Sequence, residues 1–549
     1  AVSIALLWGF DEPPSVCETG VERVDGVWNA AKQEEVAGVI RTHAGPQAEQ
    51  LVSLVDDRFR EQISRWRRTY RTACEATYVE HTQAPEALSR VFSCLDDRVQ
   101  ELKVLSSRLA EIDRSSVKQI RSGLGLLAPV SLCENQEFLS RSIGAPGSPI
   151  ERKQIADTER RIVEIRSLHN FSRHREALVA AQSLYDDVSD VGNSFAISIA
   201  LARLGIAEVK VGRVKASRNH LHEAVRLALE SGNRVAAAKA WDQLVFVEAD
   251  LDSDFETAIQ YGKWALALRD YFLDRPGSVA VMHSRLGWAL NEIGRTAEAE
   301  YHAKQALDLR VEAYGELHPE TAYSYFHSGR LELYSGRCVT GIPLFERASR
   351  IFEELHGAHS RGFVWATHDK GACLLELGRL DEAAQAFESV RHWYLSERGP
   401  EHVMTAFLDR DFARLWLARG DWKQATPYIE IALSTFGSER GPEQIDYAET
   451  LGVYGNVLAK SGSEKRAEKA YREAIGTIRG IAGKDSFRQL EALEGLAALL
   501  ESKGRLSEAA EAYAQSIAIR DAHYGAGHES CIPSRNAYTR LVARADLKR

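Results

Sequence analysis

Glycine residues in the second half of the chain recur at a fixed interval of 42 residues. Two such series are present, and the second follows the first by 21 residues throughout. Their members are Gly294, Gly336, Gly378, Gly420, Gly462 and Gly504, and then Gly315, Gly357, Gly399, Gly441, Gly483 and Gly525. Glycine ends helices because it adopts a left-handed backbone conformation without steric cost. Each 42-residue unit is therefore predicted to hold two helices and two turns, and the tandem units to stack as a solenoid.

The segments between these glycines superpose as well, namely residues 286–307, 370–390, 454–475 and 493–517. Small residues recur where two helices approach closely, and bulky ones fill the next layer, at Phe345, Phe387, Tyr471 and Tyr513. A Leu-Gly pair on the first helix, followed by Ala, an aromatic residue and Ala on the second, resembles the tetratricopeptide repeat (TPR). The 42-residue period and the loop Ala313-Tyr-Gly-Glu-Leu-His-Pro-Glu-Thr-Ala322 are similar to the long repeats of kinesin light chains.

This resemblance implies an all-α chain, with an N-terminal helical hairpin or bundle followed by a right-handed α-solenoid. Weaker helix pairs are expected near residues 155–186, 196–229 and 235–269, which brings the total to about nine pairs. The predicted segments are 1–17 (end of a transmembrane helix, with a linker), 18–135 (helical bundle), 136–152 (linker), 153–528 (TPR solenoid) and 529–549 (capping helix).

The composition supports a folded chain, with 44% hydrophobic and 27% charged residues among 549. The formal net charge of −9 disfavours nucleic acid as the partner. The opening residues 1–10 are apolar but too few to cross a bilayer, which needs about 20. We interpret them as the outer end of a membrane-spanning helix, and the alternatives are the tail of a signal peptide or an apolar segment docked on the first domain.

Two apolar stripes predict long helices before the repeats. Val55, Phe59, Ile63, Trp66, Tyr70 and Cys74 form one, and Leu88, Leu95, Leu102 and Leu109 form the other. The break at 82–85 predicts an antiparallel hairpin between them. Counted from a turn near residue 84, Cys74 and Cys94 would lie level, so a Cys74–Cys94 disulfide is expected in an oxidising compartment, with Cys17–Cys133 closing the domain. The alternative is four buried thiols.

This N-terminal region also resembles a second group of proteins, the bacterial membrane serine/threonine kinases that carry TPR arrays. The similarity is to the extracytoplasmic, C-terminal part of these kinases. The resemblance rests on Gly26-Val-Trp28-Asn, Ala73-Cys74-Glu-Ala-Thr77 and Cys94-Leu-Asp-Asp-Arg98. It implies a sensor region placed on the periplasmic side of a membrane, with signal transduction as its role.

Motifs for catalysis are missing from the sequence. It has no glycine-rich phosphate loop with the accompanying Ala-x-Lys, His-Arg-Asp and Asp-Phe-Gly motifs, and no Gly-x-Ser-x-Gly elbow. Zinc spacings such as Cys-x-x-Cys and His-Glu-x-x-His do not occur either. We therefore expect no enzyme activity, cofactor or metal site in this chain, although the full-length protein could be a serine/threonine kinase.

A binding groove is expected instead on the concave wall, which the first helix of each repeat forms. The residues predicted to face it are Trp288, Asn291, Tyr323, Phe326, Arg330, Tyr334, His368, Arg410, Arg414, Asn456 and Lys460. The asparagines would bond a peptide backbone, the aromatic side chains would anchor the ligand, and the cations would attract carboxylates. The predicted function is a noncatalytic scaffold for a protein or an extended, acidic peptide. The alternatives are a stand-alone cytoplasmic adaptor and a fragment of a kinase.

Overall fold

The computed structural model describes residues 16–114, 116–124, 127–135, 139, 148–251, 254–268, 276–358, 360–439, 441–528 and 531–546. Within these ranges every regular element is helical and no β-strand occurs, as the resemblance implied. None of the helices in the same ranges is long and apolar enough to cross a bilayer. The apolar start of the chain, predicted to end a membrane helix, lies outside the described residues.

The chain divides into two compact units. Residues 1–244 with 267–276 form the amino-terminal unit, and residues 245–266 with 277–549 form the carboxy-terminal unit. The linker predicted at 136–152 falls inside the first unit, and most of it lies outside the described residues. The predicted boundaries at that linker therefore stay a prediction.

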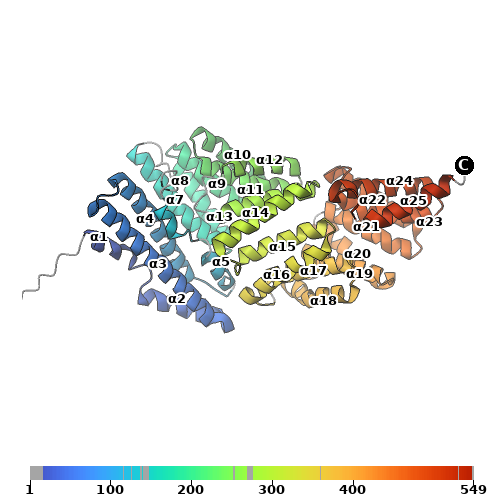
Figure 1. Ribbon diagram of the computed structural model, residues 1–549, viewed down its shortest axis with the longest axis horizontal. Coiled ribbons are helices and arrows are strands. Elements are labelled where there is room, and N and C mark those ends of the chain that lie inside the picture. The colour runs from blue at the N-terminus through green and yellow to red at the C-terminus, as the bar shows by residue number, and fades with distance from the viewer. Residues whose placement is uncertain are drawn as a thin grey trace, which may run out of the picture. The chain divides into compact units, whose positions relative to one another are not determined.

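The amino-terminal unit begins with short helices and a long hairpin (Figure 1). Its elements up to residue 134 are α1 (Val16–Thr19), η1 (Gly20–Val24), α2 (Ala30–His43), η2 (Gly45–Gln47), α3 (Ala48–Tyr78), α4 (Pro85–Leu109), η3 (Val117–Gln119), α5 (Ile120–Leu124) and η4 (Val130–Glu134). Both predicted apolar stripes are buried along α3 and α4, and they meet in one core. The predicted hairpin is confirmed.

The predicted cysteine pairing is wrong. The structure joins Cys17 to Cys74 and Cys94 to Cys133, with Cα–Cα distances of 5.6 Å in both pairs. The error comes from the register of the hairpin. α3 ends at Tyr78, and Trp66 Nε1 on α3 donates a hydrogen bond to the Leu95 carbonyl on α4 at 2.8 Å. Residue 66 is level with residue 95, so Cys74 lies about seven residues, or roughly 10 Å, from the level of Cys94.

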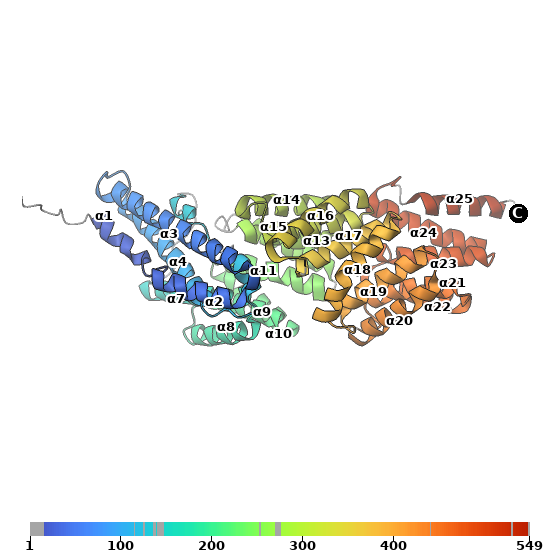
Figure 2. The same cartoon turned by 90° about the horizontal axis from the view of Figure 1, so that it is seen from below.

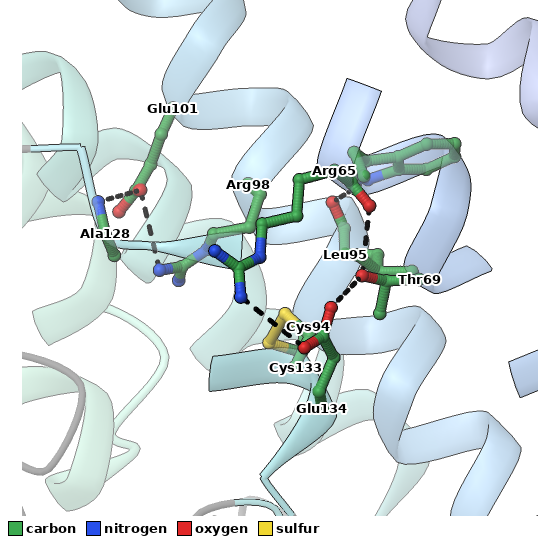
Figure 3. The surroundings of a disulfide bond; sticks show 10 residues. Arg65, Thr69, Cys94, Leu95, Arg98, Glu101, Ala128, Cys133 and Glu134 are labelled. Atoms are coloured by element: carbon green, nitrogen blue, oxygen red, sulfur yellow. Dashed lines mark hydrogen bonds and ion pairs between the residues drawn. A yellow bond between two sulfur atoms is a disulfide. The ribbon is translucent and has the colours of Figure 1, made fainter. Parts of the chain in front are cut away.

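The Cys94–Cys133 bond holds η4 against the hairpin (Figure 3). Glu134 follows Cys133 and accepts a hydrogen bond from Thr69 Oγ1 on α3 at 2.6 Å. On α4, Glu101 accepts a hydrogen bond from the Ala128 amide at 3.3 Å, just before η4. The disulfide is thus one of several links between η4 and both arms of the hairpin.

Helix pairs follow the hairpin: α7 (Pro149–Asn170), α8 (His174–Ser189), α9 (Ser194–Lys210), α10 (Val214–Glu230), α11 (Arg234–Phe246), the π-helix η5 (Val247–Leu251) and α12 (Phe255–Ala267). Gly192, Gly212 and Gly232 take left-handed φ values of 76°, 82° and 76° between them, and Ser172 takes 62° in the same series. The weaker repeats predicted upstream are thus present, with turns 20 residues apart.

The carboxy-terminal unit continues the pattern with regular pairs (Figure 2). After η5 and α12, its helices are α13 (Pro276–Glu292), α14 (Thr296–Tyr314), α15 (Pro319–Tyr334), α16 (Cys338–His356), α17 (Arg361–Glu376), α18 (Leu380–Glu397), α19 (Val403–Ala418), α20 (Trp422–Glu439), α21 (Ile445–Lys460), α22 (Glu464–Ala482), η7 (Phe487–Gln489), α23 (Leu490–Ser502), α24 (Leu506–Tyr524) and α25 (Ile532–Asp546). All twelve glycines of the two series take φ values between 67° and 93°.

Two pairs, α15 with α16 and α21 with α22, show why their first helix carries a glycine. A Cβ added at Gly329 would stand 2.8 Å from the Phe345 ring, and one at Gly455 would stand 2.5 Å from the Tyr471 ring. The aromatic residue on the second helix is therefore accommodated by the missing side chain on the first. At the end of the array α25 buries Ala537 and Leu541 in the last core cluster, where a capping helix was expected.

Candidate peptide-binding groove

Eleven residues were predicted for the groove, and all of them lie on first helices, between α13 and α21. Four of the eleven converge on one cavity between α13 and α15, namely Trp288, Asn291, Arg330 and Tyr334. The cavity measures about 30 Å³, and its other lining residues are Ser284, Gly287, Ala303, Ala306, Ser324, His327 and Leu331. This volume accommodates one or two waters, or one small polar group of a ligand.

Asn291 is the most unusual residue of this cavity. It is fully buried, at 0% exposure, and neither its Nδ2 nor its Oδ1 has a hydrogen-bond partner among the described residues. A buried polar group without a partner costs about 1–3 kcal/mol. Such a group is expected where a ligand or an ordered water supplies the missing bonds.

The opposite wall of the cavity carries a cation and a phenol. Arg330 lies with its Nε 3.4 Å from Asp369, and it donates a hydrogen bond to the Tyr334 hydroxyl. Burial raises the pKa of Tyr334, so its hydroxyl stays protonated at neutral pH. Enclosure by the groove walls, together with the charges of Arg330 and Arg310, lowers the pKa of His327 to about 3. His327 is therefore a neutral imidazole on this wall.

Arg410 and Arg414 have carboxylate partners within the chain. Arg410 donates to Glu449 at 2.9 Å, and Arg414 donates to Glu491 at 2.7 Å. Glu449 also accepts from Arg488 at 2.9 Å. Burial raises the pKa of Glu449, but Arg488 and Arg410 together hold it below its usual value. The concave arginines thus form a chain of ion pairs that joins α19, α21 and the start of α23.

The remaining predicted residues contribute mainly to packing. His368 is buried and bonds Tyr394 at 3.1 Å and Asp411 at 3.0 Å. Asn456 donates to Glu491 at 3.0 Å and accepts from Tyr471 at 2.7 Å, so its amide is satisfied, unlike that of Asn291. Tyr323 packs edge-on against Phe352, and Phe326 is buried against Trp365. Lys460 is exposed at the end of α21.

The carboxylates of the concave wall were missed at the sequence level. Glu449 and Glu491 lie in the same register as Tyr323, in steps of 42 residues, and Asp369 and Asp411 lie in the register of His327. An alignment that considered every position of the first helices, acidic residues included, would have identified these four carboxylates. No signal of this kind points to Arg488, because its partner Glu292 lies 196 residues away in sequence.

The groups that line the cavity can form hydrogen bonds and apolar contacts with a ligand. The described residues hold no group of three or more His, Cys, Asp or Glu side chains placed to bind a metal. Beside the half-buried Trp288, the cavity holds one amide whose donor and acceptor have no partner in the part of the chain that the structure describes. Trp288 is itself held edge-on by Phe255 at 5.7 Å between ring centroids.

Two segments of the chain match family models of the tetratricopeptide repeat, residues 278–354 and residues 490–530. The chain therefore contains tetratricopeptide repeats, which form scaffolds with extended concave surfaces for binding proteins. Both matched segments lie in the carboxy-terminal unit, and the first one includes the cavity between α13 and α15. No curated protein matches the sequence.

Solved structures with a similar arrangement are also known. A Rap protein complexed with competence and sporulation factor is 15% identical, covering 73% of this chain and 100% of its own, with a TM-score of 0.43. A putative kinesin light chain of Podosopora anserina with nearly identical TPR-like repeats is 15% identical, covering 38% and 97%, with a TM-score of 0.31. PilF of Pseudomonas aeruginosa is 18% identical, covering 46% and 95%, with a TM-score of 0.31. Identities of 15–18% with TM-scores of 0.31–0.43 carry no argument about function.

Proposed function

We propose that this chain is a noncatalytic protein-interaction scaffold that binds an extended peptide segment at the cavity between α13 and α15. The observation that carries the proposal is the buried amide of Asn291, whose donor and acceptor both lack a partner in the described part of the chain. A peptide group carries one N–H and one C=O, so it matches this amide on both sides. Tandem repeats of this type bind such segments along their concave wall.

The size and lining of the cavity define what it accepts. A volume of about 30 Å³ admits one small polar group rather than a large side chain. Trp288 and Leu331 supply apolar contact beside the amide, and Arg330 and Tyr334 supply polar groups opposite to it. We therefore propose that one main-chain amide, or the amide of one side chain, enters the cavity while the rest of the segment follows the groove.

The expected acidity of the partner receives little support from the charges. Arg330, Arg410 and Arg414 each have a carboxylate partner, in Asp369, Glu449 and Glu491. A ligand carboxylate would have to compete with these internal groups. Lys460 is the exposed cation of the predicted set. We propose main-chain recognition as the basis of binding.

The test is selection of peptides from a random display library on the full chain, followed by titration of the best peptide. We expect Asn291→Ala to weaken binding about tenfold or more, because two hydrogen bonds worth about 1 kcal/mol each are lost. The matched control is Tyr301→Ala, an exposed residue of α14 that does not line the cavity. Equal affinity of the Asn291→Ala and Tyr301→Ala proteins would overturn the proposal.

We propose further that the scaffold is the sensor region of a bacterial serine/threonine kinase signalling protein, facing the periplasm. The resemblance of the N-terminal region to such kinases supports this proposal, and so do two disulfides in that region, because such bonds persist in oxidising compartments. The alternative is a stand-alone cytoplasmic adaptor. Thiol counting on protein purified from its native cell distinguishes them, with three free thiols expected for the periplasmic form and seven for the cytoplasmic one.

A further inference from the structure

The first and last repeats of the carboxy-terminal unit are in direct contact. Arg488, in η7, donates to Glu292 at the end of α13 at 2.9 Å, although 196 residues separate them. Thr296, at the start of α14, donates to the His523 carbonyl in α24 at 3.1 Å across 227 residues. The superhelix therefore closes on itself. The yellow-green and red parts of this unit meet in both ribbon views (Figures 1 and 2).

Aromatic side chains extend this contact to the cavity. Phe487 stacks on His523 with ring centroids 4.5 Å apart, and it also packs against Tyr334 at 5.9 Å. Tyr334 lines the cavity, and Glu292 directly follows Asn291. If Phe487 and Arg488 move away from the first repeat, Tyr334 in the cavity wall loses its ring contact with Phe487. Glu292, next to Asn291, then loses its ion pair with Arg488.

The closing contact is of a different kind from the contacts within the solenoid. Neighbouring repeats share apolar cores, whereas repeats far apart in sequence need no contact for a solenoid to fold. The contact between first and last repeats is built from the Glu292–Arg488 ion pair and the hydrogen bond of Thr296 to the His523 carbonyl, with the Phe487 ring against Tyr334 of α15 beside them. Buried ion pairs give little net stability, because the loss of hydration offsets their attraction. Separating the first repeat from the last therefore costs far less free energy than unfolding a repeat.

We infer that Glu292, Gly294 and Thr296 on one side and Phe487, Arg488 and His523 on the other form a latch that regulates access to the Asn291 cavity. In the closed state the cavity has room for only one small group. An extended segment passing along the concave wall requires the open state, so a partner that binds there shifts the population toward opening. This last step rests on the proposed function, whereas the latch itself is tested without any ligand.

Gly294 provides a sharp steric test. It lies in the latch with φ of 77°, and a Cβ built on it would stand 3.0 Å from Nδ1 of His523. Asparagine adopts this left-handed conformation, so Gly294→Asn pushes on His523 without breaking the turn. Gly378 occupies the equivalent position two repeats later, with φ of 72° and open space where a Cβ would be. Gly378→Asn is therefore the matched control for any general effect of asparagine in the turn.

Hydrogen exchange and small-angle X-ray scattering on the full chain are the measurements. In Gly294→Asn we expect amide protection to fall about tenfold in both 289–297 and 487–496, and the radius of gyration to rise. Gly378→Asn should change neither. Loss of protection around residue 294 alone, with 487–496 unchanged, would show that no latch exists.

Arg488→Gln tests the electrostatic half of the latch. It removes the ion pairs to Glu292 and Glu449, and its control is Arg520→Gln, which loses a two-bond pair to Glu494 within one repeat. We expect the library-selected peptide to bind Arg488→Gln several-fold more tightly than Arg520→Gln. If hydrogen exchange shows that Arg488→Gln opens the latch while the peptide affinity stays the same, the latch does not regulate access to the cavity. Absence of any selected peptide would refute the proposed function, while the exchange data would still decide the latch.

Discussion

Two buried asparagines, Asn233 and Asn291, differ in the hydrogen bonding of their side chains. Asn233 donates to the Phe195 carbonyl at 3.3 Å and to Ser198 at 3.1 Å, and it accepts from the Ala236 amide at 3.1 Å. Within the described ranges, neither side-chain atom of Asn291 has a hydrogen-bond partner. The first residue serves the fold, and the second lowers stability in the absence of a ligand.

We predict that Asn291→Leu stabilises the carboxy-terminal unit by about 1–3 kcal/mol, because the cost of an unsatisfied buried amide is removed. Asn233→Leu should destabilise the amino-terminal unit by a comparable amount, since it leaves the partner groups of Asn233 unpaired. Urea unfolding of the full chain, followed by hydrogen exchange to assign each transition to its unit, measures both effects. A destabilised Asn291→Leu protein would show that an unseen bond stabilises this amide.

His523 gives the latch a dependence on pH. Burial, aided by the charge of Arg337, lowers the pKa of His523 from 6.5 to about 4, even though a hydrogen bond with the Tyr334 main chain opposes the shift. Because the folded pKa lies below the unfolded one, this contribution to stability is complete above about pH 6.5 and is lost as the pH falls toward 4.

We expect this loss to reach about 3 kcal/mol, from a shift of roughly two and a half units at 1.36 kcal/mol each. The measurement is the free energy of unfolding from pH 7 to pH 4 in the natural protein and in His523→Gln. The difference between the two curves isolates His523, because His302 and His327 titrate in both proteins. Parallel curves would contradict the prediction.

At the scale of elements, glycines fall into two classes that a substitution to alanine separates. The turn glycines have left-handed backbones, where a side chain is strained even if space is open. Gly476 instead lies inside helix α22 and is exposed, with nothing within 4 Å of the place where a Cβ would be. There, glycine only weakens the helix, because it has more conformational freedom to lose on folding.

The two substitutions should therefore have opposite signs. Gly378→Ala is expected to lower the stability of the carboxy-terminal unit by about 1 kcal/mol or more, through strain at φ of 72°. Gly476→Ala is expected to raise it by about 0.5–1 kcal/mol. Thermal unfolding monitored by circular dichroism resolves changes of this size. Equal signs would mean that backbone conformation does not set the pattern of glycines.

At the scale of the whole molecule, the two compact units are stabilised differently. The disulfides join residues 57 and 39 positions apart, and both lie in the amino-terminal unit. Closing loops of this length stabilises a folded chain by about 4 kcal/mol each on the loop-entropy model. The carboxy-terminal unit has instead the buried thiols Cys338, Cys373 and Cys531.

Reduction with dithiothreitol should thus destabilise the amino-terminal unit by several kcal/mol and leave the carboxy-terminal unit unchanged. Unfolding curves in oxidising and reducing buffer test this, with hydrogen exchange assigning the transitions. Cys94→Ser together with Cys133→Ser should reproduce about half of the effect without reductant. A reductant-sensitive carboxy-terminal unit would contradict the prediction.

Local features of this protein could be predicted from its sequence because local spacing encodes them. Glycine spacing predicted the turns of the repeats, and apolar spacing predicted α3 and α4. Four of the residues selected by the first-helix alignment line one cavity, and their role in binding stays a prediction. Each of these features depends on residues within one or two helices of each other, so a short window of sequence is sufficient.

Contacts between distant residues were decided only by the tertiary structure. The cysteine pairing depended on a hairpin register that a shift of a few residues in the turn changes. The meeting of Glu292 with Arg488 depends on how far the superhelix turns over several repeats. That turn is the sum of small rotations between neighbouring repeats. The repeat length alone determines that a solenoid forms, but only the accumulated geometry of all repeats determines that it closes.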